Sequence, residues 1–176
     1  LWDGVLAAKA EGLEFKEVQK CLPLEEQYYY LKDLGHTDTE LLRFQAINVE
    51  AFWRQLFESA AQAMEQAIEE SGIEAAIKNY HTMKAEKEAK YYFGENDFNA
   101  LGYRLVGSGK IDEAIEIFKL NIDAFPESWN VYDSLAEAYM TKEKNELAIK
   151  YYKKSIELNP ENNNAKEILK RLEKNK

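Results

Sequence analysis

The fold is decided by LGYRLVGSGKIDEAIEIFKLNIDAFP at residues 101–126, a pattern that returns 34 positions later as LAEAYMTKEKNELAIKYYKKSIELNP at residues 135–160. The shared positions are Leu101, Gly102, Leu105, Ala114, Ile115, Phe118 and Pro126 in the first copy, and Leu135, Ala136, Tyr139, Ala148, Ile149, Tyr152 and Pro160 in the second. A recurrence at this period is typical of helix-turn-helix repeats, because one hairpin buries its apolar face only when a neighbour stacks on it. The sequence therefore predicts stacked helical hairpins.

The shared residue types have definite roles in such a hairpin. Gly102 and Ala136 are small where the two helices of a hairpin cross, so the backbones can approach closely. Phe118 and Tyr152 supply an aromatic ring beyond that contact. A proline closes each copy, since proline cannot donate the backbone hydrogen bond that a continuing helix requires.

With the small residue, the alanine, the aromatic and the proline at these offsets, both copies resemble tetratricopeptide repeats (TPRs). The resemblance implies an all-α fold, a right-handed TPR-like solenoid, with an N-terminal helical region and a C-terminal capping helix. We expect four parts: an N-terminal helical region at 1–56, a degenerate first repeat with an extended second helix at 57–94, two clear repeats at 95–162 and a capping helix at 163–176. A scaffold of this kind implies protein binding without naming the partner.

The first 94 residues carry weaker helical patterns. Short helices are expected at 1–10, around 15–22 and at 24–34. Thr37 and Glu40 form a capping box, which predicts that a long helix begins there and runs to about residue 71, with a break near Asn48 or Phe57 left open. In the degenerate repeat Ala63 and Met64 take the crossing positions, and the alternating charges of 84–90 predict a solvated extension of its second helix.

The last helix has the character of a cap. Asn162 or Asn163 is placed to cap its N-terminus. Its apolar face is expected at Ala165, Ile168, Leu169 and Leu172, and its polar face at Lys166, Lys170, Arg171 and Lys174. One apolar and one polar face is what the terminal helix of an array requires.

Charge argues against nucleic acid as the partner. The net charge is -9, but residues 1–140 carry 13 Lys and Arg against 26 Asp and Glu, whereas 141–176 carry 10 against 6. An acidic body repels phosphate, and the basic end lacks the interleaved arginines and aromatics of a nucleic-acid reader.

The chain shows no apolar run of membrane-spanning length and no signal segment. It has one cysteine, Cys21, so an internal disulfide is excluded. Its first residue, Leu1, suggests a processed protein or an excised fragment. We expect a soluble protein and leave the choice between cytoplasm and periplasm open.

No catalytic constellation emerges from the sequence. The two histidines, His36 and His81, lack metal-ligand spacing, so we predict no metal, no cofactor and no catalytic residue in this chain. The run Gly-Ser-Gly-Lys at 107–110 lacks the preceding strand and the full spacing of a phosphate-binding loop, and is expected to be the turn inside a repeat.

The resemblance implies which side chains line the concave groove of the repeats. They are Asn96, Asn99, Ala100, Tyr103 and Val106 in one repeat, Asn130, Asp133, Ser134, Glu137 and Met140 in the next, and Glu167, Ile168 and Arg171 on the capping helix. Family members that bind acidic C-termini have lysine and asparagine where this chain has Asn99, Tyr103, Asp133 and Glu137. A neutral or basic partner is therefore expected in place of an acidic-tailed one.

Two functional classes stay open. The first is a non-catalytic scaffold that binds a peptide, a partner helix or an adjoining domain. The second is the accessory or dimerisation tail of a larger bacterial hydrolase, because residues 99–103 and the Tyr-Asp-Ser-Leu run at 132–135 resemble C-terminal extensions of such enzymes. The opening helices also resemble the helical tail that follows a metallo-beta-lactamase-type core; a serine hydrolase is the other parent considered.

Overall fold

The computed structural model describes residues 57–86 and 90–174. The helices expected within 1–56 lie outside the described residues. In order, the elements are β1 (Glu58–Ser59), α5 (Ala60–Ser71), α6 (Ile73–Ala85), β2 (Tyr91–Tyr92), α7 (Glu95–Gly107), α8 (Ile111–Ala124), α9 (Trp129–Thr141), α10 (Asn145–Leu158) and α11 (Asn163–Lys174). The predicted all-helical repeat array is confirmed, and the chain divides into two compact units, residues 1–62 with 80–92 and residues 63–79 with 93–176.

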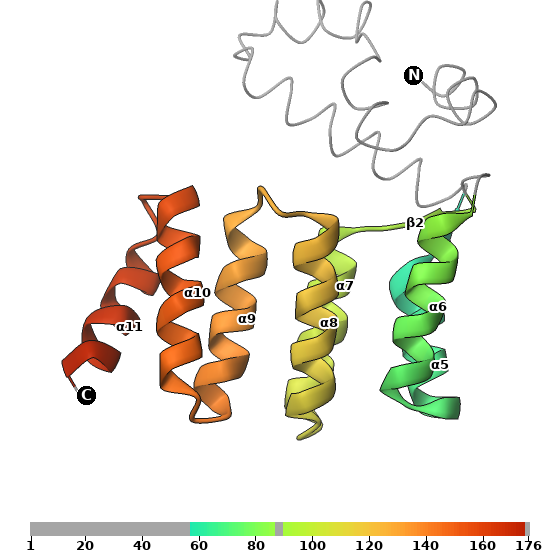
Figure 1. Ribbon diagram of the computed structural model, residues 1–176, viewed down its shortest axis with the longest axis horizontal. Coiled ribbons are helices and arrows are strands. Elements are labelled where there is room, and N and C mark those ends of the chain that lie inside the picture. The colour runs from blue at the N-terminus through green and yellow to red at the C-terminus, as the bar shows by residue number, and fades with distance from the viewer. Residues whose placement is uncertain (1–56, 87–89, 175–176) are drawn as a thin grey trace, which may run out of the picture. The chain divides into compact units, whose positions relative to one another are not determined.

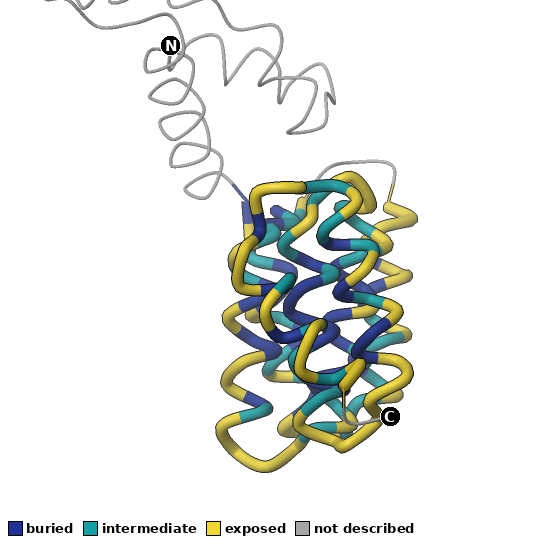
Figure 2. Tube along the Cα trace, turned by 90° about the vertical axis from the view of Figure 1, so that its left-hand side faces the viewer, coloured by how far each residue is buried: buried dark blue, intermediate teal, exposed yellow. Residues whose placement is uncertain are grey.

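In the second unit α7 to α11 form a row of antiparallel neighbours (Figure 1). Each helix packs against the next along the chain, and α7 also contacts α9, so the first helices of the two clear repeats are adjacent. Figure 2 shows that buried positions recur along one side of these helices. Fully buried side chains include those of Phe98, Leu101, Phe118, Leu135 and Tyr152. The residues that recur at 34 positions are thus the core of the array.

The crossing of α7 and α8 is close enough to require a glycine. A Cβ placed on Gly102 would lie 2.4 Å and 2.5 Å from two ring carbons of Phe118. The second repeat has Ala136 opposite Tyr152 at the same positions. The role predicted for the small residue is confirmed at Gly102, where even one methyl group has no room.

The turns inside the two clear repeats are also copies of each other. Gly109 and Glu143, 34 positions apart, both have a left-handed backbone, with φ of 76° and 58°. After them, Lys110 N donates to Leu105 O at 2.9 Å and Lys144 N donates to Tyr139 O at 2.9 Å, bonds that close each first helix. The run at 107–110 is therefore the turn between α7 and α8, as expected.

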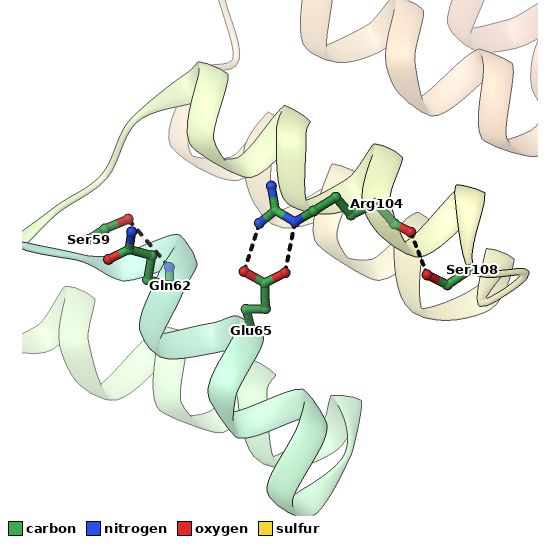
Figure 3. A network of polar contacts seen from close by, with 5 residues as sticks. All are labelled: Ser59, Gln62, Glu65, Arg104 and Ser108. Carbon is green, nitrogen blue, oxygen red and sulfur yellow. Dashed lines mark hydrogen bonds and ion pairs between the residues drawn. The ribbon is translucent and has the colours of Figure 1, made fainter.

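The long helix predicted to reach residue 71 is interrupted. Residues 58–59 are extended, and α5 begins at Ala60 with Ser59 as its cap, because Gln62 N donates to Ser59 Oγ at 3.3 Å (Figure 3). The break near Phe57, left open from the sequence, is the one found. Ser59 and Gln62 have the spacing of a second capping box, and the bond from Gln62 N to Ser59 Oγ is one of its two hydrogen bonds.

The extension predicted for 84–90 is wrong, because α6 ends at Ala85. Tyr91 and Tyr92 instead form β2, which pairs in parallel with β1 in the first unit. Glu58 N also donates to Lys90 O at 3.1 Å. This pairing needs an extended backbone before Tyr91, so a tertiary contact overrides the helical preference of the charged residues.

Candidate functional site

The residues expected to bind a partner lie on α7, α9 and α11, the first helices of the repeats and the cap. We call the exposed and half-buried part of this surface the first-helix face; its members are Asn96, Ala100, Tyr103, Val106, Asn130, Glu137, Met140 and Arg171. Tyr103 is 43% exposed, which makes it the most exposed large apolar side chain of the described residues.

Tyr103 connects the two clear repeats across this face. Its hydroxyl donates to Glu137 Oε2 at 2.6 Å and lies 3.2 Å from Ser134 Oγ. Its ring meets Phe118 edge to face, with centroids 5.3 Å apart. Burial, together with the hydrogen bond to the Glu137 carboxylate, raises the pKa of Tyr103, so the phenol stays protonated and remains a donor at neutral pH. The ring is therefore held in place while part of it stays exposed.

Two of the residues assigned to the groove are turned inward. Asn99 is 8% exposed and Asp133, 34 positions later, is 9% exposed. Asn121 Nδ2 donates to Asn99 Oδ1 at 3.0 Å, and Ser155 Oγ donates to Asp133 Oδ1 at 3.3 Å. Both bonds join the first helix of a repeat to its second helix. The same pair of positions thus carries one buried polar contact in each repeat.

The contact in the second repeat also holds the cap. Asn162 Nδ2 donates to Asp133 Oδ1 at 2.8 Å, while Asn162 Oδ1 accepts from Ala165 N at 3.1 Å and so caps α11. Of the two asparagines considered for this cap, Asn162 is the one used. Burial raises the pKa of Asp133, an effect that Glu137 strengthens and that the bonds from Asn162 and Ser155 oppose.

These contacts narrow the set of side chains that could reach a partner. Asn99, Asp133 and Ser134 are buried, and their polar atoms bond within the array, Ser134 Oγ also donating to Asn130 O at 3.1 Å. The resemblance to the repeat family placed them on the groove by their offsets in the repeat, whereas Asn99 and Asp133 bond to Asn121 and Ser155 on the second helices. No local signal in the sequence pairs positions 22 apart.

Other members of the first-helix face keep exposed area. Asn130 is half-buried and its Nδ2 donates to Glu95 Oε1 at 3.0 Å, a second link between α7 and α9. Val106 and Met140 are half-buried, while Asn96 and Arg171 are exposed. Arg171 has no ion-pair partner among the described residues.

One ion pair on the first helices was not anticipated. Arg104 Nε and Nη2 each donate to one oxygen of Glu65 at 2.8 Å, a bidentate contact between α5 and α7 within the second unit (Figure 3). In the register of the degenerate repeat Glu65 takes the place that Tyr103 and Glu137 take in the clear repeats. The pair is largely exposed and adds little stability. It neutralises Glu65, so among the described residues Glu137 is the acid at this repeat position that has no cationic partner.

The aromatic residue of the second repeat carries a hydroxyl that its counterpart Phe118 lacks. Tyr152 is 0% exposed, and its hydroxyl has no hydrogen-bond partner in the part of the chain that the structure describes. Burial, followed by the charges of Glu137 and Asp133, raises the pKa of Tyr152, whereas Arg171 acts in the opposite direction.

Within the described ranges no three His, Cys, Asp or Glu side chains gather as a metal site would require. No helix among those same residues has the length and apolar character needed to span a bilayer.

Comparison with known proteins identifies the repeat. The family model of the tetratricopeptide repeat matches residues 130–162. This stretch is similar to a tetratricopeptide repeat. The matched range runs from the first turn of α9 to the cap residue of α11.

No curated protein matches this chain. Among solved structures, a chain of the crystal structure of the APC/C hetero-tetramer Cut9-Hcn1 is similar, with 19% identity over 80% of this chain and 27% of that chain and a TM-score of 0.46. The chain thus spans about a quarter of that protein's length.

Proposed function

We propose that this chain is a non-catalytic scaffold for protein-protein interaction, whose first-helix face binds a neutral or basic protein segment. One observation carries the proposal: Tyr103 presents a fixed, 43% exposed ring whose hydroxyl is anchored on Glu137. A fixed, partly exposed aromatic ring beside a carboxylate suits a lysine or arginine side chain, through apolar contact along its stem and attraction at its charged end.

The charges near Tyr103 support the same choice of partner. Glu137 is half-buried beside buried Asp133, and the carboxylate of Glu65 is already paired with Arg104. A carboxylate brought next to Glu137 would be repelled by about 1 kcal/mol at the dielectric of a protein surface. Half-buried Val106 and Met140 lie about one turn further along α7 and α9 than Tyr103 and Glu137 and add apolar surface.

The test is a titration of the full chain with a basic and an acidic-tailed peptide, followed by amide shifts of Tyr103 and Glu137. The basic peptide should bind more tightly and shift both signals. Glu137→Gln should weaken it about tenfold, the loss expected for one close charge-assisted contact. Glu127→Gln, in the exposed turn between α8 and α9, is the matched control and should change nothing. Tight binding of the acidic peptide alone would refute the proposal.

The alternative is that the partner is an adjoining domain, in an accessory or dimerisation tail of a larger hydrolase. It rests on the resemblance of 99–103 and 132–135, and the comparisons above lend it no support. Reading the gene on both sides of this segment would test it, since an upstream metal-binding histidine cluster or serine nucleophile is required.

A further inference from the structure

The second helix of the second clear repeat has exposed apolar surface that its counterpart in the first repeat lacks. Leu147 on α10 is 39% exposed, and Tyr151, one turn later on the same side of the helix, is half-buried. In the first repeat the same positions hold Glu113, which is half-buried, and Ile117, which is fully buried. The repeat fold is therefore satisfied without an exposed leucine at position 147.

Tyr151 is held in place by two contacts. Its ring stacks on the ring of Tyr139, with centroids 5.5 Å apart and planes 9° from parallel. Tyr139 is buried, so Tyr151 rests on the core of its own repeat. Lys150 Nζ lies 5.4 Å from the centroid of the Tyr151 ring, as in a cation-π contact. The surface next to Leu147 is therefore preorganised, which lowers the entropic cost of binding a partner.

Two lysines flank this surface and lack a counter-charge. Lys144 stands one turn before Leu147 and Lys150 one turn after it; both are exposed, and neither has an ion-pair partner among the described residues. Neighbouring lysines are neutralised, in the pairs Lys142 with Asp112, Lys153 with Glu173 and Lys154 with Glu157. The first repeat has Glu116 at the position of Lys150. The repeat fold therefore does not require this positive charge, which favours an acidic partner.

We call this surface the α10 patch; its members are Lys144, Leu147, Lys150 and Tyr151. We propose that the α10 patch binds an acidic amphipathic helix of a partner protein. One apolar side chain of that helix packs on Leu147 and Tyr151, and a carboxylate on each side of it meets a lysine. The site is separate from the first-helix face and goes beyond the proposed function.

The spacing of the two lysines favours a helical partner. Lys144 and Lys150 are six positions apart, which is about 9 Å along a helix axis. A partner helix covers this distance with acids about seven positions apart and the apolar residue about three positions after the first, all on one face. An extended chain covers it in about three residues, whose side chains would then point to opposite sides.

The experiment uses the full chain and a capped helical peptide of about 18 residues, made of alanine and glutamine with Glu at positions 6 and 13 and Leu at position 9. One control peptide has Ser in place of the Leu, and another has Gln in place of both Glu. In calorimetry the first peptide should bind at least fivefold more tightly than either control. Its amide shifts should centre on Leu147 and Lys150 and leave Tyr103 and Glu137 unchanged.

Variants take their residues from the first repeat, so that the array should stay folded. Leu147→Glu introduces the residue type of position 113, and Lys150→Glu that of position 116. Each should weaken binding of the first peptide at least tenfold and leave the unfolding midpoint unchanged. Lys170→Glu makes the same change of charge on the exposed side of α11 and is the matched control, expected to alter the affinity less than twofold.

Three results would overturn the inference. The first is equal binding of the leucine and serine peptides, or no binding of either. The second is an equal loss in Lys150→Glu and Lys170→Glu, which would show that net charge alone attracts the peptide. The third is self-association of the chain that Leu147→Glu abolishes, which would assign the α10 patch to a second copy. None of them concerns the basic segment at the first-helix face, so the two proposals can fail independently.

Discussion

Two glycines of α7 should respond in opposite directions to the same substitution. Gly102 lies at the crossing with α8, where an added Cβ would stand 2.4 Å, 2.5 Å and 2.9 Å from three ring carbons of Phe118. Gly107, at the last turn of the same helix, has no neighbouring heavy atom within 4 Å of its Cβ position. Alanine has a higher helix propensity than glycine at both positions. The difference between the two variants in the free energy of unfolding therefore measures the steric effect at the crossing of α7 and α8.

The magnitude follows from the overlap. An ordinary Cβ contact lies at 3.4–4 Å, so the ring must move by about 1 Å, and overpacking of this kind costs typically 1–3 kcal/mol. The gain from replacing glycine in a helix interior is up to about 1 kcal/mol. Gly102→Ala should therefore lower the free energy of unfolding by about 1–2 kcal/mol, whereas Gly107→Ala should leave it unchanged or raise it by up to about 1 kcal/mol.

Urea unfolding followed by far-ultraviolet circular dichroism measures both variants. A second change tests the cause: adding Phe118→Leu to Gly102→Ala should cost less than the sum of the two single losses, because the smaller side chain vacates the overlap. Equal stabilisation by Gly102→Ala and Gly107→Ala would refute the reasoning, as would strict additivity in the double variant.

Four further substitutions and one deletion test the repeat turns, the buried polar contact and the cap. Glu143→Gly should stabilise the chain by about 1 kcal/mol because glycine accepts the left-handed backbone, and Gly109→Ala should have the opposite effect in thermal unfolding. Since the pKa of Asp133 is raised in the folded state, its ionisation opposes folding as pH rises from about 4. Asp133→Asn should therefore unfold at an equal or higher urea concentration at pH 7 and converge with the parent near pH 4, whereas Asp133→Ala should lose about 1–3 kcal/mol at pH 7 because Asn162 loses its acceptor. Deleting 163–176 should uncover the apolar side of α10 and cause self-association, and a truncated chain that sediments as a stable monomer would contradict this.

The sequence predicts the repeats well because the residues that recur every 34 positions are also the ones that contact one another in the core. The 34-residue recurrence places α7 to α10 and their turns correctly, since the recurring residues are the buried ones. The cap also follows from local pattern, as Asn162 and the buried Ala165 and Ile168 demonstrate. In a repeat fold, the residues that set the sequence period are therefore the residues that pack together.

The errors arise where distant parts of the chain decide the local backbone. The charged stretch after α6 favours a helix by propensity, but β2 must be extended to pair with β1, more than 30 positions earlier. The sequence did not predict the cap at Ser59, because apolar residues continue at helical spacing on both sides of it. Local preference is a weak guide when a tertiary contact competes with it.

The binding face was harder to predict than the fold, because one repeat position can serve packing or recognition. Family offsets assign Asn99 and Asp133 to the groove, yet each lies under 10% exposed and bonds to the second helix of its own repeat. Only the hydrogen bonds to Asn121 and Ser155 show that these two residues serve packing. Polarity alone therefore does not identify a ligand-binding residue in a repeat fold.

The arrangement divides the polar residues of the first helices into two classes with different consequences. Asn99 and Asp133 repeat the same buried contact, so changes there should alter stability. Tyr103, Glu137 and Arg171 occupy another repeated position but differ in charge and chemistry from helix to helix, so changes there should alter the partner and leave the array folded. Exchanging Glu137 for Gln should therefore leave the unfolding midpoint nearly unchanged while weakening the binding of a basic segment. A large loss of stability in that exchange would mean that this repeated position supports the fold, and the separation of the two classes would be wrong.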